Sequence, residues 1–136
     1  MLVDTNVVSE LMRARPARSV MEWADRQQRF EMSVVSIEEI LYGLHARPNA
    51  RLSAWFDRFL DQHCEIFPVT ISIARHCARL RAALRVRGRP RTRADLLIAA
   101  TAYEHGLALV TRNLRDFVGC GIPLVNPFEA SPRAGI

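Results

Sequence analysis

Lysine is absent from this chain of 136 residues, in which all nineteen basic residues are arginine. The absence excludes two kinds of site that act on phosphate groups. A phosphate-binding loop of the GxxxxGK type needs its lysine to reach the nucleotide phosphates. A receiver-type phosphotransfer site, in which acids at strand ends gather around Mg²⁺, also relies on a lysine. Any chemistry on phosphate must therefore use other side chains.

Cysteine is scarce, and its spacing suits neither a zinc site nor a disulfide framework. Cys64, Cys77 and Cys120 are odd in number, lie far apart and include no CxxC pair, so we expect buried or incidental thiols.

Long apolar runs are missing too. No segment approaches the length of a membrane span, and no charged stretch precedes an apolar one near the N-terminus. These features predict a cytoplasmic protein.

The chain contains no repeat, no low-complexity linker and no change of composition that would divide it. Its length is sufficient for one hydrophobic core. We therefore predict a single domain over residues 1–128, followed by a C-terminal tail at residues 129–136.

Positive charge is concentrated in one part of the chain. The net charge is +5, yet residues 66–94 contain eight arginines and no acid. Near the end of that stretch, arginine alternates with Gly88 and Pro90, which predicts a mobile basic loop that contacts phosphates. A solvated surface turn is the alternative. No aromatic residues are interleaved, so base stacking is not expected to be its main role. The arginines of this loop are Arg85, Arg87, Arg89, Arg91 and Arg93.

Short apolar segments alternate with longer segments of helical periodicity. Strands that alternate with helices indicate an α/β fold, with a parallel sheet covered on both faces. The predicted strands lie at residues 2–4, 32–35, 65–69, 107–111 and 123–125. The predicted helices include residues 7–13, 17–29, 36–44, 52–60, 73–84 and 94–105. The last of these is apolar on nearly all sides and should be central.

Four carboxylates stand where an apolar segment meets a helix start or a turn. Burying a carboxylate there is costly without a cation or hydrogen-bond donors. In open parallel sheets, sites form beyond the carboxyl ends of the strands. Acids in such places, with no set of Lys, Cys or His beside them, point to a hard divalent metal, Mg²⁺ or Mn²⁺. The four acids are Asp4, Glu39, Asp95 and Asp116.

Helix capping is the alternative role for these acids. Ser36 precedes Glu39, and Thr92 precedes Asp95, at the spacing of a capping box, in which the acid satisfies a helix N-terminus without a metal. Asp4 could likewise cap the helix that follows it. A haloacid-dehalogenase-type site is excluded, because it needs a second acid at the place where Asn6 stands.

Two details favour a ligand site over capping alone. Glu39 lies away from the apolar stripe of its helix and shares its face with Gly43, whose bare backbone leaves room for a ligand. Asp95 opens a helix that is too apolar to tolerate a stray charge. Asp116 is the weakest of the four, and Asn113, whose amide oxygen could hold a metal-bound water, is the alternative to it.

Four segments follow one another in the order and spacing typical of one family. They are DTNVVSE at residues 4–10, SIEEILYGL at 36–44, ADLLIAATA at 94–102 and VTRNLRDF at 110–117. Together they resemble the PIN-domain ribonucleases, and most of all the VapC toxins of bacterial toxin–antitoxin pairs, including the FitB-like branch. The resemblance covers about residues 1–128.

The resemblance implies a three-layer α/β/α sandwich around a five-stranded parallel sheet. It also implies an endoribonuclease toxin that depends on Mg²⁺ or Mn²⁺. The acids of the family correspond to Asp4, Glu39 and Asp95, with Asn6 and Thr111 as polar supports. The fourth acid is Asp116 in this chain, which follows the pattern of relatives that have asparagine at the place of Asn113.

Two partners are implied in the same way. VapC-like proteins usually form homodimers, and a small VapB-like antitoxin neutralises them. The antitoxin wraps over helices that correspond to residues 7–60 and can place a basic side chain in the acidic pocket. An alternative function is a catalytically silent PIN-like module that binds RNA or a partner, although the intact set of acids argues against it.

The RNA substrate should lie against the basic loop and two arginines near the fourth acid. Phosphate contacts position RNA, whereas base choice depends on pockets that the sequence does not reveal. The predicted RNA-binding residues are Arg85, Arg87, Arg89, Arg91, Arg93, Arg112 and Arg115.

Overall fold

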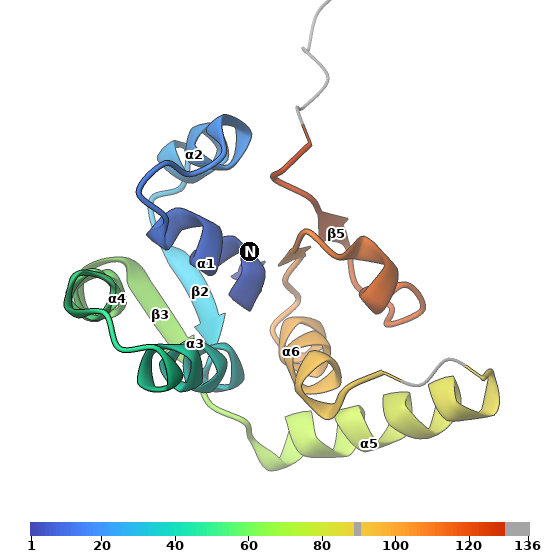
Figure 1. Ribbon diagram of the computed structural model, residues 1–136. Helices are drawn as coiled ribbons and strands as arrows, with labels where there is room; N and C mark the ends of the chain where they lie inside the picture. The colour runs from blue at the N-terminus through green and yellow to red at the C-terminus, as the bar shows by residue number, and fades with distance from the viewer. Residues whose placement is uncertain (89–90, 130–136) are drawn as a thin grey trace, which may run out of the picture.

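The computed structural model describes residues 1–88 and 91–129 and contains a five-stranded sheet (Figure 1). All four strand pairings are parallel, and the order of the strands is β3-β2-β1-β4-β5. The strands are β1 (Leu2–Val3), β2 (Phe30–Ser33), β3 (Cys64–Phe67), β4 (Leu109–Val110) and β5 (Leu124–Val125).

β1 lies at the centre of the sheet, although it comes first in the chain. Leu2 pairs with Glu31 of β2 on one side and with Leu109 of β4 on the other. Because parallel neighbours end at the same edge of a sheet, the segments that follow β1 and β4 emerge next to each other. Asp4 follows β1, and Thr111 follows β4.

Helices cover both faces of the sheet. Leu2 and Val3 are adjacent in β1 and point to opposite faces, and each belongs to a separate buried cluster. The cluster around Val3 takes side chains from α1 to α4, and the cluster around Leu2 takes them from α5 and α6. The α/β/α sandwich is thus confirmed. The helices are α1 (Thr5–Met12), α2 (Arg18–Asp25), α3 (Val34–Ala46), α4 (Ala50–His63), α5 (Ile71–Val86) and α6 (Arg93–Glu104).

α6 is buried over most of its surface, as predicted. Ala99, Ala100 and Ala102 have no exposed surface, and α5 packs against the helix. α6 ends at Glu104, and Gly106 follows with a φ of +64°, a conformation that glycine adopts without strain. Asp95, in the first turn of this helix, is therefore attached to an element that packing holds in place.

The structure corrects the predicted boundaries ahead of Glu39. The strand predicted at residues 32–35 spans Phe30–Ser33, and the next helix begins at Val34 rather than at residue 36. Ser33 ends the strand because its Oγ accepts a hydrogen bond from the backbone N of Val35 at 3.1 Å and so caps α3. The two β-branched valines made the strand look longer than it is.

Two further elements differ from the prediction. The helix predicted at residues 17–29 ends at Asp25, which leaves four polar residues to lead into β2. A 3₁₀-helix, η1 (Leu114–Phe117), was not predicted, because one turn has no apolar periodicity. The three cysteines are buried free thiols. Among the described residues, no helix is both long and apolar enough to cross a bilayer.

Candidate active site

Asp4 lies just beyond the carboxyl end of β1 and is only 5 % exposed. Its Oδ1 accepts a hydrogen bond from the backbone N of Thr5 at 2.8 Å, so Asp4 is the N-cap of α1. Its Oδ2 accepts from Thr111 Oγ1 at 2.8 Å and from Asn6 Nδ2 at 3.2 Å. Capping thus engages one oxygen, while the other faces the end of β4.

Asn6 and Thr111 form a bridge between the ends of β1 and β4. Asn6 Nδ2 donates to Thr111 Oγ1 at 3.3 Å, and Asn6 Oδ1 accepts from the backbone N of Arg112 at 3.1 Å. Asn113 takes part through its backbone N, which donates to Thr111 Oγ1 at 3.1 Å. Both predicted supports therefore contact the carboxylate of Asp4, whereas Asn113 joins this bridge through its main chain.

Glu39 belongs to the second turn of α3 and points to the start of α1. Its Oε1 accepts a hydrogen bond from Thr5 Oγ1 at 2.8 Å. The capping box predicted for Glu39 is wrong, because Ser33 caps α3 and Ser36 is buried inside the helix. Sequence reasoning missed Thr5, whose place directly after Asp4 is the only signal for it.

Asp95 lies in the first turn of α6, where Thr92 is the N-cap. The backbone N of Asp95 donates to Thr92 Oγ1 at 3.1 Å. The cap of this helix is thus supplied by a hydroxyl, and the carboxylate of Asp95, which is half-buried, is not the N-cap. The Thr92 half of the predicted capping box is therefore formed, and an acid in the first turn also interacts favourably with the helix dipole.

Asp116 is carried by η1, and Arg91 fixes that element. Arg91 Nε donates to the carbonyl O of Asp116 at 2.8 Å, and Arg91 Nη2 donates to the carbonyl O of Arg115 at 3.1 Å. Sequence reasoning assigned Arg91 to RNA binding and missed this contact, for which the sequence gives no signal. Arg91 therefore positions the loop that holds the fourth acid.

The other predicted RNA-binding residues lie on the surface. The guanidinium of Arg112 lies 4.6 Å from the centroid of the Phe128 ring, a cation–π contact that holds its side chain. Arg89 lies outside the described residues. The remaining members, all exposed, are Arg85, Arg87, Arg93 and Arg115.

The acids influence one another electrostatically. Burial raises the pKa of Asp4 to about 6, and the charges of Asp95 and Glu39 add to this rise, while hydrogen bonds from Thr111 and Thr5 oppose it. Burial also raises the pKa of Asp95, to which Asp116 adds and which Arg91 opposes. The four acids therefore form a connected series, Glu39–Asp4–Asp95–Asp116.

The acids are not close enough to surround one ion directly. Within residues 1–88 and 91–129, no three His, Cys, Asp or Glu side chains form a group that could hold a metal. Mg²⁺ typically takes one or two carboxylates, keeps several waters and binds substrate phosphate. A buried carboxylate with raised pKa beside other acids fits such a cation, since a positive charge relieves both burial and repulsion. A site with four direct carboxylate ligands does not fit.

The fold and this acidic centre define an α/β/α domain with acids gathered beyond the carboxyl edge of a parallel sheet. Comparison with protein families matches residues 1–118 to the PIN domain. The chain belongs to the PIN-domain family. Its relatives place it among the VapC-type proteins, a group of nucleases that depend on divalent metals.

Similar proteins match over nearly their whole length. The VapC ribonuclease Y4jK of Sinorhizobium fredii is 32 % identical, with 94 % of this chain and 97 % of the relative covered. Toxin FitB of Neisseria gonorrhoeae is 28 % identical, with 94 % and 98 % covered.

Solved structures agree with these relatives. The FitAcB structure from Neisseria gonorrhoeae has a TM-score of 0.81 at 28 % identity and covers 94 % of this chain and 98 % of that one. A DNA-bound VapBC structure from Salmonella typhimurium has a TM-score of 0.80 at 27 % identity, with 93 % and 96 % covered.

Proposed function

We propose that this protein is an endoribonuclease toxin that hydrolyses RNA phosphodiester bonds with Mg²⁺, or Mn²⁺ in its place, and that a small antitoxin neutralises it. One observation carries the proposal most directly. Asp4 is buried at the carboxyl edge of the central strand, with its pKa raised to about 6 and three further acids in series with it. A buried cluster of negative charge is destabilising without a cation, which makes a metal-dependent role the physically consistent one.

The acids and their hydrogen-bond partners have different roles in the proposed reaction. Bound metal supplies charge neutralisation at the phosphate and a water of lowered pKa. We assign Asp4 and Asp95 to holding it directly, and Glu39 and Asp116 to orienting its waters or a second ion. Thr5 fixes the carboxylate of Glu39 by the bond at 2.8 Å. Asn6 and Thr111 orient Asp4 in the same manner, and we infer that Asp116, rather than Asn113, completes the set.

Cleavage by the purified protein should require a divalent metal. Single-stranded RNA should be cut with Mg²⁺ or Mn²⁺ and remain intact with a chelator, because the acids alone offer no group that lowers the pKa of water. The products are resolved on a denaturing gel. RNA that is bound but uncut in every metal condition would instead support the silent binding module.

The RNA itself should contact the surface arginines, of which Arg85, Arg87, Arg93 and Arg115 are exposed.

The antitoxin is expected to occupy a groove of about 720 Å³ between α1, α3 and α4. Glu39 and Thr5 line one end of it, and Met12, Ile40 and Leu44 line its apolar part. An extended or helical segment in this groove would reach the acidic centre with a basic side chain.

We propose further that the toxin acts in the cytoplasm, as a homodimer, and that residues 1–128 form its one domain. Of the tail predicted at 129–136, residues 130–136 lie outside the described residues.

Gly43 should control access of the antitoxin. It lines this groove, and a Cβ built on it would meet no atom within 4 Å. Gly43→Trp should therefore be accommodated by the fold, fill the groove and prevent neutralisation. Its RNA cleavage is measured separately on the purified protein, because Gly43 lies one turn from Glu39. Gly43→Ala is the matched control: it should raise helix stability by up to about 1 kcal/mol and leave neutralisation intact. Co-expression of each variant with the antitoxin measures the effect as growth. Growth rescued equally well in Gly43→Trp would place the antitoxin elsewhere.

A further inference from the structure

α5 presents an arginine-rich face to solvent. Ile73, Cys77 and Leu84 mark its buried side. At 3.6 residues per turn, the opposite side carries Ala78 and Ala82, which are both exposed and one turn apart. Exposed arginines flank these alanines along the helix: Arg81 and Arg85 on one side, Arg75 and Arg79 on the other.

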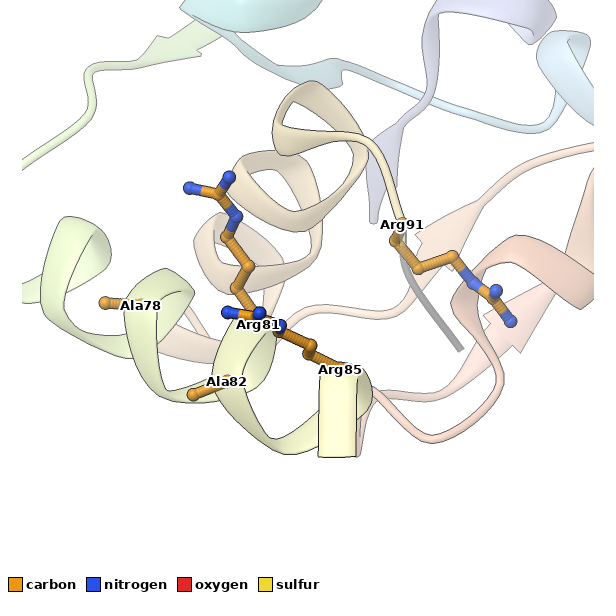
Figure 2. A pocket seen from close by; sticks show the side chains of 5 residues that line it. All are labelled: Ala78, Arg81, Ala82, Arg85 and Arg91. Carbon is orange, nitrogen blue, oxygen red and sulfur yellow. The ribbon is translucent and has the colours of Figure 1, made fainter. Parts of the chain in front are cut away.

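The surface beside this helix is hollowed. A groove of about 710 Å³ lies between α5 and Arg91, and we call it the α5 groove. Figure 2 shows its five lining residues: Ala78, Arg81, Ala82 and Arg85 come from α5, and Arg91 stands across from them. The volume lies within the range of ligand sites, so the groove can take a segment of a polymer rather than a single ion.

The α5 groove is strongly positive. Residues 66–94 contain no acid, and within the described part of the chain neither Arg81 nor Arg85 takes part in a salt bridge. Burial raises the pKa of Cys77, and the charges of Arg81 and Arg93 both oppose that rise, so both cations act on the same part of α5. Such a concentration of cations attracts phosphate.

Arg91 connects the α5 groove to the acidic centre. Its side chain lines the groove, and its Nε donates to the carbonyl O of Asp116 at 2.8 Å. The charge of Asp116 in turn acts on Asp95. Arg91 thus lies both at the groove and against the element that carries Asp116, so an RNA strand with one phosphate at the acids can continue into the groove.

We propose that the α5 groove binds the sugar–phosphate backbone of RNA beside the scissile phosphate, with Arg81 and Arg85 as the phosphate-binding side chains. The two residues are one helical turn apart, about 6 Å, and can contact neighbouring phosphates. None of the described residues that line the groove is aromatic, which favours backbone contacts without base preference. This inference rests on the proposed ribonuclease function and adds a second anchoring region to it.

The α5 groove should make affinity depend on the length of the RNA. A short oligonucleotide reaches only the acidic centre, whereas a longer strand also reaches Arg81 and Arg85. The groove should therefore strengthen the binding of long RNA more than the binding of short RNA.

The double variant Arg81→Gln/Arg85→Gln tests this directly. Binding of labelled single-stranded RNA, one short and one long, is measured in chelator across a salt series. Long RNA should bind roughly ten-fold more weakly, and its log–log salt slope should fall by about 1.4, that is about 0.7 for each phosphate that is no longer neutralised. Short RNA should lose much less affinity than long RNA, because it does not span the groove. Arg26→Gln/Arg58→Gln, which removes the same charge from α4 and the end of α2, is the matched control and should leave the slope unchanged.

A second variant keeps both arginines. Ala82→Glu places a negative charge in the groove at an exposed helix position and should weaken binding of long RNA in the same direction. If long RNA binds all proteins alike while the parent still cleaves RNA, the α5 groove is not an RNA site and the ribonuclease function stands. If duplex DNA, but not RNA, loses affinity in the variants, the surface binds DNA and the proposal is overturned. A parent that neither binds nor cuts RNA removes both proposals.

Discussion

Replacing Asp4 with asparagine should lower RNA cleavage by at least about 100-fold and abolish growth arrest in a bacterial host. Loss of a group that only supports a metal ligand typically costs 10–100-fold in metal affinity or activity, so loss of the buried carboxylate itself should cost at least as much. Cleavage of labelled RNA by purified protein and colony counts after induction measure the two effects.

The fold of the Asp4→Asn protein should survive. Asparagine caps helices about as well as aspartate, so the bond to the backbone N of Thr5 can be kept. Glu10→Gln is the matched control: Glu10 is a buried acid of the same helix, but its carboxylate pairs with Arg13. The control should cleave RNA normally. An Asp4→Asn protein that is folded and as toxic as the parent would show that the acidic centre has been assigned wrongly.

Replacing Asp95 with asparagine should separate stability from activity. Thr92 caps α6 through the backbone N of Asp95, which asparagine retains. The change removes a half-buried charge that repels Asp4, so the metal-free protein should be as stable as the parent or more stable. Cleavage should nevertheless be lost, and the rise in melting temperature on adding Mg²⁺ should be blunted, because metal binds only the folded state.

The same electrostatics predict how stability depends on pH. The pKa of Asp4 is about 6 in the folded protein, against 3.8 for an unperturbed aspartate. The folded state therefore binds the proton more tightly, and the stability gained from protonation is complete below pH 3.8 and lost as pH rises through 6. For Asp4 the loss is on the order of 3 kcal/mol. The raised pKa of Asp95 acts in the same direction.

Thermal melts of parent and Asp95→Asn, in chelator and in Mg²⁺, across this pH range measure both effects. The parent should lose stability as pH rises through about 6 in chelator and recover it with Mg²⁺, and Asp95→Asn should show a smaller loss and a smaller recovery. A role at the helix N-terminus alone predicts a loss of about 0.3–1 kcal/mol in the variant, because the charge no longer interacts with the helix dipole, with no effect of Mg²⁺ and full activity. A parent that melts identically with and without metal, beside a destabilised variant, would exclude the metal site.

Most of the architecture could be predicted from the sequence, because its apolar segments have clear periods. All five strands lie at or near the predicted places, and the position of Asp4 beyond β1 followed from where a short apolar run stops. The elements that failed were those set by one side chain. Ser33 ends β2 and caps α3 by a hydrogen bond, and a propensity pattern cannot weigh that bond against two following valines.

The site was predictable as a set of residue types but not as a geometry. Acids in series along the chain indicated a metal site, yet their separation, which leaves no three of them in one ligand group among the described residues, depends on packing. Thr5 and Arg91 were missed for a related reason. Each acts through a contact with a residue 34 or 25 positions away, and no local pattern records such a partner.

The placement of β1 between β2 and β4 bears on how the protein is made. Asp4 leaves the ribosome first, but Thr111, which donates to its carboxylate, is 107 residues later, and Asp116 follows it. Because β4 must be inserted beside β1 before these side chains can meet, a chain still in synthesis lacks the complete acidic centre. The order of the strands thus delays assembly of the acidic centre until the segment that carries β4 and Asp116 has been synthesised.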